Sequence, residues 1–216
     1  MGRRRKSDKI ILSGSAKDPF STSIGKEEHA VKIAVLYASS RKGGNSERLA
    51  KALVEGLDAD SIFLTDYRIE PIIDYRHTEP GPYPEDDYRK LLDRVLKQDL
   101  LIFATPIYWY GMPGRLKLFI DRWSQSLREN RKDFLERMAG KRAYVLAVGD
   151  DDPHVKGKAL IEQFRHIFDF VGIRFAGHVI GRGNRPGDIE QDTEALSAVR
   201  EIRSRILAEL EAGSSR

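Results

Sequence analysis

Cysteine is absent from this 216-residue sequence. Its absence excludes disulfide bonds, thiolate nucleophiles, cysteine-ligated iron–sulfur clusters and zinc ribbons. Long hydrophobic runs are also absent, and none approaches the roughly 20 residues that a membrane-spanning helix needs. The five histidines are scattered without the short spacing that metal ligands show, so we predict no metal site.

A recognisable export signal is lacking as well. The basic run Arg3–Lys6 is followed by only three apolar residues, Ile10 to Leu12, before a serine and a glycine interrupt them. The apolar core of an export signal needs roughly 7–15 residues. We therefore expect a cytoplasmic protein that does not associate with membranes.

The chain carries little excess charge outside its N-terminus. Residues 1–29 hold seven Lys/Arg and four Asp/Glu, a balance of +3, which leaves +1 of the total +4 for the rest. A nearly neutral body makes a nucleic-acid partner improbable on electrostatic grounds. Residues 1–29 show no sustained periodicity and are interpreted as a solvated tail or an arm. The alternatives are contact of Arg3 to Lys6 with RNA or an acidic surface, and an arm that wraps a partner subunit. Residues 30–212 are predicted to form one domain.

Within that domain, short apolar runs rich in β-branched residues alternate with amphipathic stretches. We expect strands over 31–38, 59–65, 100–104, 142–148 and 173–180. Helices are expected over 45–56, 85–97, around 116–123, 160–171 and 196–210, and a loop over 105–113. Buried strands between amphipathic helices predict an α/β fold with helices on both faces of a five-stranded parallel sheet. Right-handed crossovers favour the doubly wound, flavodoxin-like order 2-1-3-4-5.

In such a sheet, ligands bind beyond the carboxyl ends of the strands, so the loops there are the candidate ligand-binding segments. The loop after the first strand contains Ser39, Arg41, Gly44, Asn45 and Ser46 and leads directly into a helix. Its hydroxyls, amide, guanidinium and helix-start N–H groups can all donate to an anion, and the glycine lets the backbone approach closely. The loop predicts a phosphate site, with a plain turn and helix cap as the alternative.

The loop after the third strand carries three consecutive aromatics, Tyr108, Trp109 and Tyr110. A loop cannot bury all three on one face, whereas aromatic rings at a strand end can wall a flat conjugated ligand. Packing against a neighbouring helix or subunit is the alternative. The two loops together require a ligand with a phosphate at one end and a flat ring at the other, and FMN meets that description.

Two segments resemble the FMN motifs of a known family. KIAVLYASSRKGGNSERLAKAL and IFATPIYWYGMPGRLKLFIDRW are similar to segments of flavodoxin-like NAD(P)H-dependent oxidoreductases, the NADPH-dependent FMN reductase group that includes iron–sulfur flavoproteins. The resemblance covers about residues 30–210. Iron–sulfur members carry a cysteine cluster after the second strand, where this chain has Ile69 to His77 without cysteine, so FMN is the only redox centre implied.

The resemblance also implies roles for individual residues. Ser39, Arg41, Asn45 and Ser46 would hold the FMN phosphate. Gly149 and Asp150, after the fourth strand, would approach the ring from another side. The ribityl chain and isoalloxazine ring would be lined by Thr105, Pro106, Ile107, Tyr108 and Trp109.

The activity implied is ping-pong transfer of two electrons from NAD(P)H through bound FMN to a small acceptor such as a quinone, flavin or nitroaromatic. No acid or base residue is nominated, because this chemistry needs correct placement rather than a protein nucleophile. Tyr75, Arg76 and His77 lie in a long segment that could cover the flavin, or they are ordinary surface residues. A homodimer or homotetramer is expected, since members of the family commonly associate.

Two other functions remain open from the residues alone. A flavodoxin-type electron carrier would share the fold and the cofactor, but such carriers are usually strongly acidic, unlike this nearly neutral body. A non-enzymatic, flavin-binding regulatory module has only the basic N-terminus in its favour.

Overall fold

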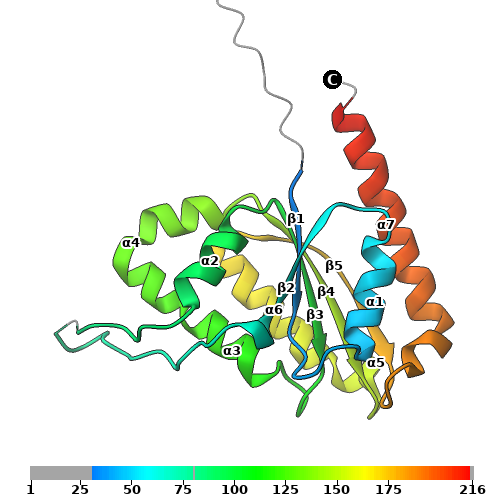
Figure 1. Cartoon of the computed structure of the whole chain (residues 1–216), viewed down its shortest axis with the longest axis horizontal. Helices are drawn as coiled ribbons and strands as arrows, with labels where there is room; N and C mark the ends of the chain where they lie inside the picture. Colours follow the sequence, from blue (N-terminus) through cyan, green and yellow to red (C-terminus); the bar gives the residue numbers. More distant parts are fainter. Residues whose placement is uncertain (1–30, 80, 215–216) are drawn as a thin grey trace, which may run out of the picture.

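Five parallel strands form one sheet in the order β2-β1-β3-β4-β5 (Figure 1). The computed structural model describes residues 31–79 and 81–214. The strands are β1 (Ile33–Tyr37), β2 (Ala59–Phe63), β3 (Leu100–Pro106), β4 (Arg142–Gly149) and β5 (Arg174–Arg182). The helices are α1 (Asn45–Val54), α2 (Tyr88–Leu96), α3 (Gly114–Asp121), α4 (Trp123–Met138), α5 (Pro153–Lys156), α6 (Lys158–Val171) and α7 (Thr193–Ser214), with short 3-10 helices η1 (Leu64–Asp66) and η2 (Asp188–Gln191). The predicted fold class and strand order are confirmed.

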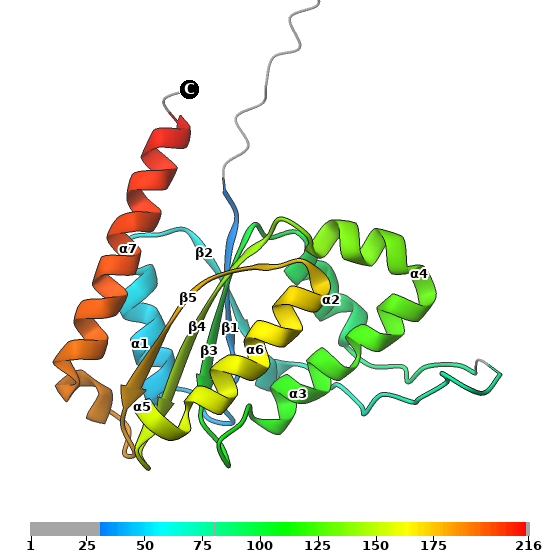
Figure 2. The same ribbon diagram turned by 180° about the vertical axis from the view of Figure 1, so that it is seen from behind.

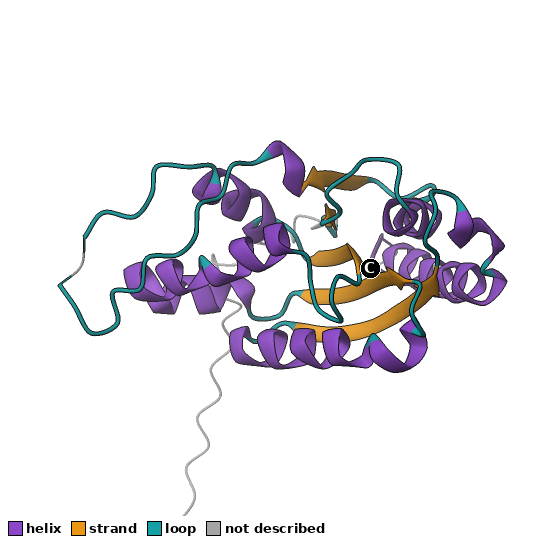
Figure 3. Cartoon of the chain, turned by 90° about the horizontal axis from the view of Figure 1, so that it is seen from below, coloured by secondary structure: helices purple, strands orange, loops and turns teal. Residues whose placement is uncertain are grey.

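The helices cover both faces of the sheet, and each face has its own core. Along β1, Ile33 and Val35 pack towards α1 and α7, whereas Ala34 and Leu36 pack towards α2, α3, α4 and α6. This follows from the period of two in a strand, which sends successive side chains to opposite faces. Figures 2 and 3 show the two helical layers on either side of the sheet.

All five strands begin or end one or two residues away from the expected positions, and the ends of β3 and β2 are two examples. The loop predicted to begin at Thr105 begins later, because Thr105 and Pro106 continue β3 in register with Ala147 and Val148 of β4. Strand β2 ends at Phe63, and the next three residues form η1. The loop after β3 therefore starts two residues later than the apolar run indicated.

Helix α4 is the main element that the sequence prediction missed. Its second half, beyond Leu127, is largely polar and lacks a broad apolar stripe. Asn130 has non-helical dihedral angles (φ −153°, ψ 79°) and its side-chain oxygen accepts a bond from Asp133 N at 3.2 Å. Asn130 thus ends one helical segment and caps the next, a role that short polar side chains favour.

A long excursion between η1 and α2 leaves the body as an extended arm, residues 71–79 and 81–84, seen at the left of Figure 1. Its root is fastened by two backbone-to-carboxylate bonds, Arg68 N to Asp87 Oδ2 and Glu70 N to Asp86 Oδ2, both 2.8 Å. Arg122, which is 1% exposed, pairs with Asp86 and donates to the Glu70 carbonyl.

The carboxylate of Asp86 is nearly as buried as its partner, with 2% of the side chain exposed. Burial raises the pKa of Asp86, but hydrogen bonds from the backbone of Glu70 and Tyr88 and from Arg122 outweigh it and leave the pKa below its usual value. The root is therefore held by an ionised, hydrogen-bonded pair.

The N-terminal tail or arm predicted over residues 1–29 lies outside the described residues. Within residues 31–79 and 81–214, no helix is long and apolar enough to cross a membrane. Helix α7 continues to Ser214, slightly past the predicted end of the domain at residue 212.

Candidate functional site

A hollow of about 190 Å³ lies at the carboxyl ends of β1, β3 and β4. Its position agrees with the rule that open α/β sheets bind ligands at the switch point of the strand order. The predicted site residues that line it are Ser39, Arg41, Gly44, Asn45, Ser46, Pro106, Ile107, Tyr108, Gly149 and Asp150. The fold thus brings together residues that lie more than 100 positions apart in the sequence.

The start of α1 and the loop before it form one end of this hollow. The first turn of a helix leaves N–H groups without partners inside the helix, and the helix dipole favours negative charge there. Gly43 adopts a left-handed conformation (φ 75°), and its N–H donates to the Glu47 carboxylate at 2.6 Å. Ser39 Oγ accepts from Arg41 N at 3.3 Å, which tightens the loop. These bonds preform the loop before any ligand arrives.

Glu47 lies in the first turn of α1 with 7% of its side chain exposed. Burial raises the pKa of Glu47, but hydrogen bonds from Lys51 and the Gly43 N–H outweigh it and lower the pKa overall. Glu47 therefore stays ionised and is satisfied within the protein.

Asn45 has a second role that the sequence did not reveal. Its Nδ2 donates to the Arg185 carbonyl and its Oδ1 accepts from Gly187 N, both at 2.9 Å. These bonds join α1 to the loop after β5. A phosphate contact from Asn45 stays a prediction, whereas its bracing of this loop is a structural observation.

The aromatic segment folds into a tight two-residue turn. Tyr108 and Gly111 exchange backbone hydrogen bonds of 3.0 Å, and Trp109 and Tyr110 between them have φ values of 48° and 62°. Two positive φ values mark a type I′ turn, which usually takes asparagine and glycine. Aromatic residues there cost backbone strain of order 1–3 kcal/mol each, and such strain clusters at functional sites.

All three rings of this turn are exposed, Trp109 to 93% and its neighbours to 42% and 44%. The sequence-based argument that a loop cannot bury three aromatics is therefore correct. The Tyr108 hydroxyl lies 3.3 Å from Ser40 Oγ, so the aromatic turn and the phosphate loop contact each other.

Trp109 and Thr105 do not line this hollow. Trp109 lines a second hollow of about 160 Å³ with Tyr110 and Lys156, next to the first. Here the Lys156 ammonium and the Tyr110 hydroxyl bind Asp151 and lower the pKa of its carboxyl. Thr105 is fully buried and its hydroxyl donates to the Pro106 carbonyl at 2.9 Å, so it supports the strand end from inside.

The sequence analysis missed Val148, Gly183 and Asn184, which also line the first hollow. Asn184 Nδ2 donates to Asp150 Oδ2 at 3.0 Å, and the Asn184 carbonyl accepts from Arg41 at 3.3 Å. The polar stretch directly after β5 could have revealed Gly183 and Asn184, because the carboxyl ends of all parallel strands lie at the same edge of a sheet.

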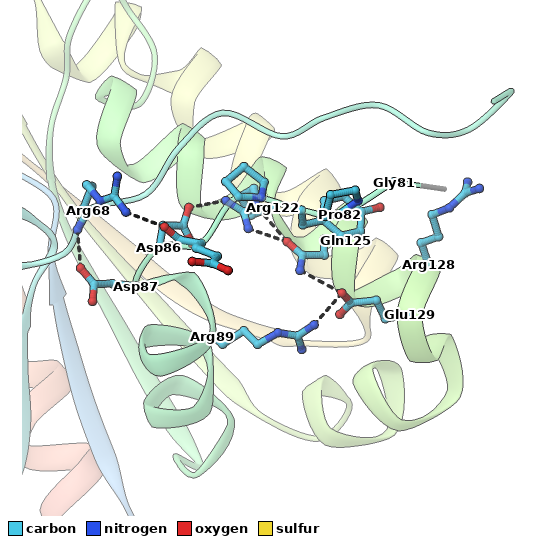
Figure 4. A pocket seen from close by; sticks show the side chains of 13 residues that line it. Arg68, Gly81, Pro82, Asp86, Asp87, Arg89, Arg122, Gln125, Arg128 and Glu129 are labelled. Atoms are coloured by element: carbon cyan, nitrogen blue, oxygen red, sulfur yellow. Dashed lines mark hydrogen bonds and ion pairs between the residues drawn. The ribbon is translucent and has the colours of Figure 1, made fainter. Parts of the chain in front are cut away.

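A larger cavity, about 930 Å³, lies elsewhere, between the arm root, α2 and α4 (Figure 4). Its walls carry a continuous network in which Arg122 joins Asp86 to Gln125, and Glu129 joins Gln125 to Arg89. The network pairs the charged groups of Arg122, Asp86, Glu129 and Arg89 and fastens the arm. We interpret it as structural.

The arm does not cover the hollow in the same chain. Tyr75, Arg76 and His77 were interpreted either as residues that could cover the flavin or as ordinary surface residues, and the arm that carries them points away from the strand ends (Figures 1 and 3). No described arm residue lines either hollow. The root contacts of Arg122 and Asp86 set this direction, and they join residues too far apart in sequence to be anticipated.

Comparisons with known proteins identify the family. Residues 31–184 match the model of the NADPH-dependent FMN reductase family. The chain is 54% identical over 177 residues to the putative NAD(P)H-dependent FMN-containing oxidoreductase YwqN of Bacillus subtilis, covering 81% of this chain and 98% of that protein. It is 25% identical to an iron–sulfur flavoprotein of Methanosarcina thermophila over 84% of this chain and 96% of that protein.

A solved structure agrees with the sequence relatives. The Trp repressor binding protein from Bacillus subtilis is 50% identical to this chain, superposes with a TM-score of 0.66, and is covered to 95% by 78% of this chain. The family match and the relative from Bacillus subtilis also decide between the enzyme and the carrier that the residues alone left open. This chain belongs to the NADPH-dependent FMN reductase family and is an FMN-dependent NAD(P)H oxidoreductase of flavodoxin-like fold.

Proposed function

We propose that the first hollow binds FMN with its phosphate at the start of α1 and its ring towards the aromatic turn. The observation that carries this proposal is the lining itself, since anion donors and ring-facing residues converge from three separate loops. The bonds that preform the phosphate loop reduce the ordering cost of binding. FMN, when bound, supplies two-electron transfer between a nicotinamide and an acceptor.

The residues divide into two groups by chemistry. Donors to the phosphate are Ser39, Arg41, Asn45, Ser46 and the first N–H groups of α1, with Gly44 allowing close approach. The ribityl chain and ring would run along Pro106, Ile107 and Tyr108 and past Gly149 and Asp150. Thr105 would act from beneath, by holding the end of β3.

A missing side chain shapes the ring end of the hollow. A Cβ atom on Gly149 would lie 3.1 Å and 3.2 Å from two carbon atoms of Ile107. These distances are tighter than ordinary van der Waals contact, so a larger residue would displace Ile107, which lines the space proposed for FMN. The geometry fits a flat ligand that needs this width.

We further propose that NAD(P)H and the acceptor occupy the second hollow in turn. It shares Ile107, Gly149 and Asp150 with the first and is open to solvent beside Trp109. An exposed indole ring offers a stacking surface for nicotinamide and for flat acceptors such as quinones, flavins or nitroaromatics. If both substrates use this one surface, NAD(P)⁺ must leave before the acceptor binds, as in a ping-pong reaction.

Stopped-flow absorbance tests this function. FMN-loaded protein mixed with NADPH or NADH should lose its flavin absorbance quickly, and a quinone should then restore it. Parallel double-reciprocal lines in steady state would support one shared surface. Flavin that stays oxidised in excess NADPH and NADH would contradict the proposed reaction.

The arm supports a proposal of homo-oligomerisation, to a dimer or tetramer. It projects without a core of its own and exposes Ile73 to 41%. An extended segment of this kind is commonly ordered by a neighbouring subunit, which buries its apolar side chains. Light scattering after size-exclusion chromatography should give a mass of two or four chains, and a monomer mass would contradict the proposal.

We also propose that the protein works in the cytoplasm, where its reductant NAD(P)H is regenerated. Fractionation of cells that express the native gene should recover the flavin-linked activity in the cytoplasmic fraction. Recovery in the membrane or extracellular fraction would contradict this proposal.

A further inference from the structure

Asp150 lies at the junction of the two hollows. It lines the first together with the phosphate loop and the second together with Trp109 and Lys156. A ligand with its phosphate at the start of α1 and its ring towards the aromatic turn must therefore pass this carboxylate. The inference that follows rests on the proposed function, namely that this ligand is FMN.

The loop after β5 holds the Asp150 carboxylate in place. Asn184 Nδ2 donates to Asp150 Oδ2 at 3.0 Å, whereas Arg182 Nε stays 4.0 Å from Oδ1. Both partners of that ion pair are more than half exposed, so solvent screens their attraction. The hydrogen bond from Asn184 is therefore the main contact that orients the carboxylate.

Asn184 is itself fixed from several sides. Its N–H donates to Asp188 Oδ2 at 3.0 Å and its carbonyl accepts from Arg41 at 3.3 Å. The preceding residue, Gly183, donates to the Gly149 carbonyl at 2.8 Å. The amide that holds Asp150 is thus part of a braced loop rather than a free surface side chain.

Asp151, the next residue, has a different environment. Its carboxylate is bound by Lys156 at 2.6 Å and by the Tyr110 hydroxyl at 2.8 Å, so a cation compensates its charge at close range. The carboxylate of Asp150 instead accepts its hydrogen bond from the neutral amide of Asn184. Asp150 therefore contributes the less compensated negative charge beside the proposed flavin.

We propose that Asp150, positioned by Asn184, lowers the reduction potential of bound FMN. Reduction moves a hydride, two electrons and one proton, from NAD(P)H to FMN and leaves NAD(P)⁺, and the same two electrons later reduce the acceptor. The reduced ring carries more negative charge than the oxidised ring, so a fixed carboxylate nearby weakens binding of the reduced form more. A lower potential favours onward transfer to a weak acceptor.

The test compares Asp150→Asn, which removes the charge and keeps a hydrogen-bonding side chain of the same size, with the wild-type protein. Midpoint potentials are measured by equilibration with reference dyes, and dissociation constants are measured for oxidised and reduced FMN. Asp150→Asn should bind reduced FMN about tenfold better relative to oxidised FMN, which raises a two-electron potential by about 30 mV. Glu136→Gln on α4 makes the same charge change far from the hollows and should leave the potential unchanged.

Asn184→Ala tests the positioning role. It should free the Asp150 carboxylate to turn towards solvent and should raise the potential by less than Asp150→Asn does. Combined with Asp150→Asn, it should add nothing, because no charge then remains to position. An equal additional shift in the double variant would overturn the positioning role.

The outcomes distinguish this inference from the function beneath it. Wild-type protein that binds no FMN contradicts both. Protein that binds FMN but shows the same potential in wild type and Asp150→Asn contradicts the inference alone and leaves the proposed function standing.

Discussion

The ion pair at the arm root leads to a quantitative stability prediction for Arg122→Met. The substitution keeps much of the side-chain volume but removes the bonds to Asp86, the Glu70 carbonyl and Gln125. It leaves the Asp86 carboxylate 98% buried without its cation, since only 2% of that side chain is exposed. Breaking a buried pair from one side costs about 3–5 kcal/mol of unfolding free energy.

Thermal unfolding measures this loss. At about 2–4 °C per kcal/mol for a domain of this size, Arg122→Met should lower Tm by about 6–20 °C. Arg128→Met makes the same change at an exposed position of α4, also labelled in Figure 4, and should change stability by less than about 0.5 kcal/mol.

A double variant separates lost contacts from the unpaired charge. Asp86→Asn should partly restore the stability of Arg122→Met, because it removes the buried carboxylate that has no partner. If Arg122→Met unfolds within 2 °C of the wild type, or if Asp86→Asn destabilises it further, the pair does not hold the arm root as described.

Three other predictions concern pH, the anion site and the ring site. Because the folded-state pKa of Asp86 is lowered, the ionised carboxylate stabilises the fold at pH values above its ordinary pKa of 3.8. This contribution is lost as the pH falls through the folded-state pKa. The free energy of unfolding in urea should therefore depend less on pH between pH 5 and 3 in Asp86→Asn than in the wild type. Arg41→Met should weaken FMN binding about 10- to 100-fold in a fluorescence titration, as expected for a lost hydrogen bond to a charged group; unchanged affinity would remove Arg41 from the phosphate site. Gly149→Ala should weaken FMN binding about tenfold through displacement of Ile107, and the free energy of unfolding should change by less than the free energy of FMN binding. A larger change in unfolding than in binding would contradict a role of Gly149 in shaping the hollow.

The parts of the fold that the sequence predicted are those fixed by local patterns. The β1 and β3 runs are apolar on both faces because helices cover both sides of the sheet, and this composition is visible without any contact information. Ser39 to Ser46 could likewise be placed at the carboxyl edge of the sheet, because this loop joins a buried strand to the following helix.

The parts that it missed depend on contacts between distant residues. The direction of the arm is set by Arg122, which lies between α3 and α4 and binds Glu70 and Asp86 at the root of the arm. Asn184 enters the site because bonds from Asn45 draw the loop after β5 across the sheet edge. The second half of α4 has only Phe134, Leu135 and Met138 as apolar residues, a stripe too narrow for periodicity to predict the helix.

The central claim is that the hollow at the strand ends binds FMN by its phosphate. Apoprotein titrated with FMN and with riboflavin, which lacks the phosphate, tests it most directly through quenching of flavin fluorescence. The account predicts that FMN binds with at least a hundredfold higher affinity than riboflavin, because a phosphate dianion gains several charge-assisted hydrogen bonds. It also predicts that this preference falls by about 10- to 100-fold in Arg41→Met. Equal affinity for the two flavins, or no binding of either, would contradict the account.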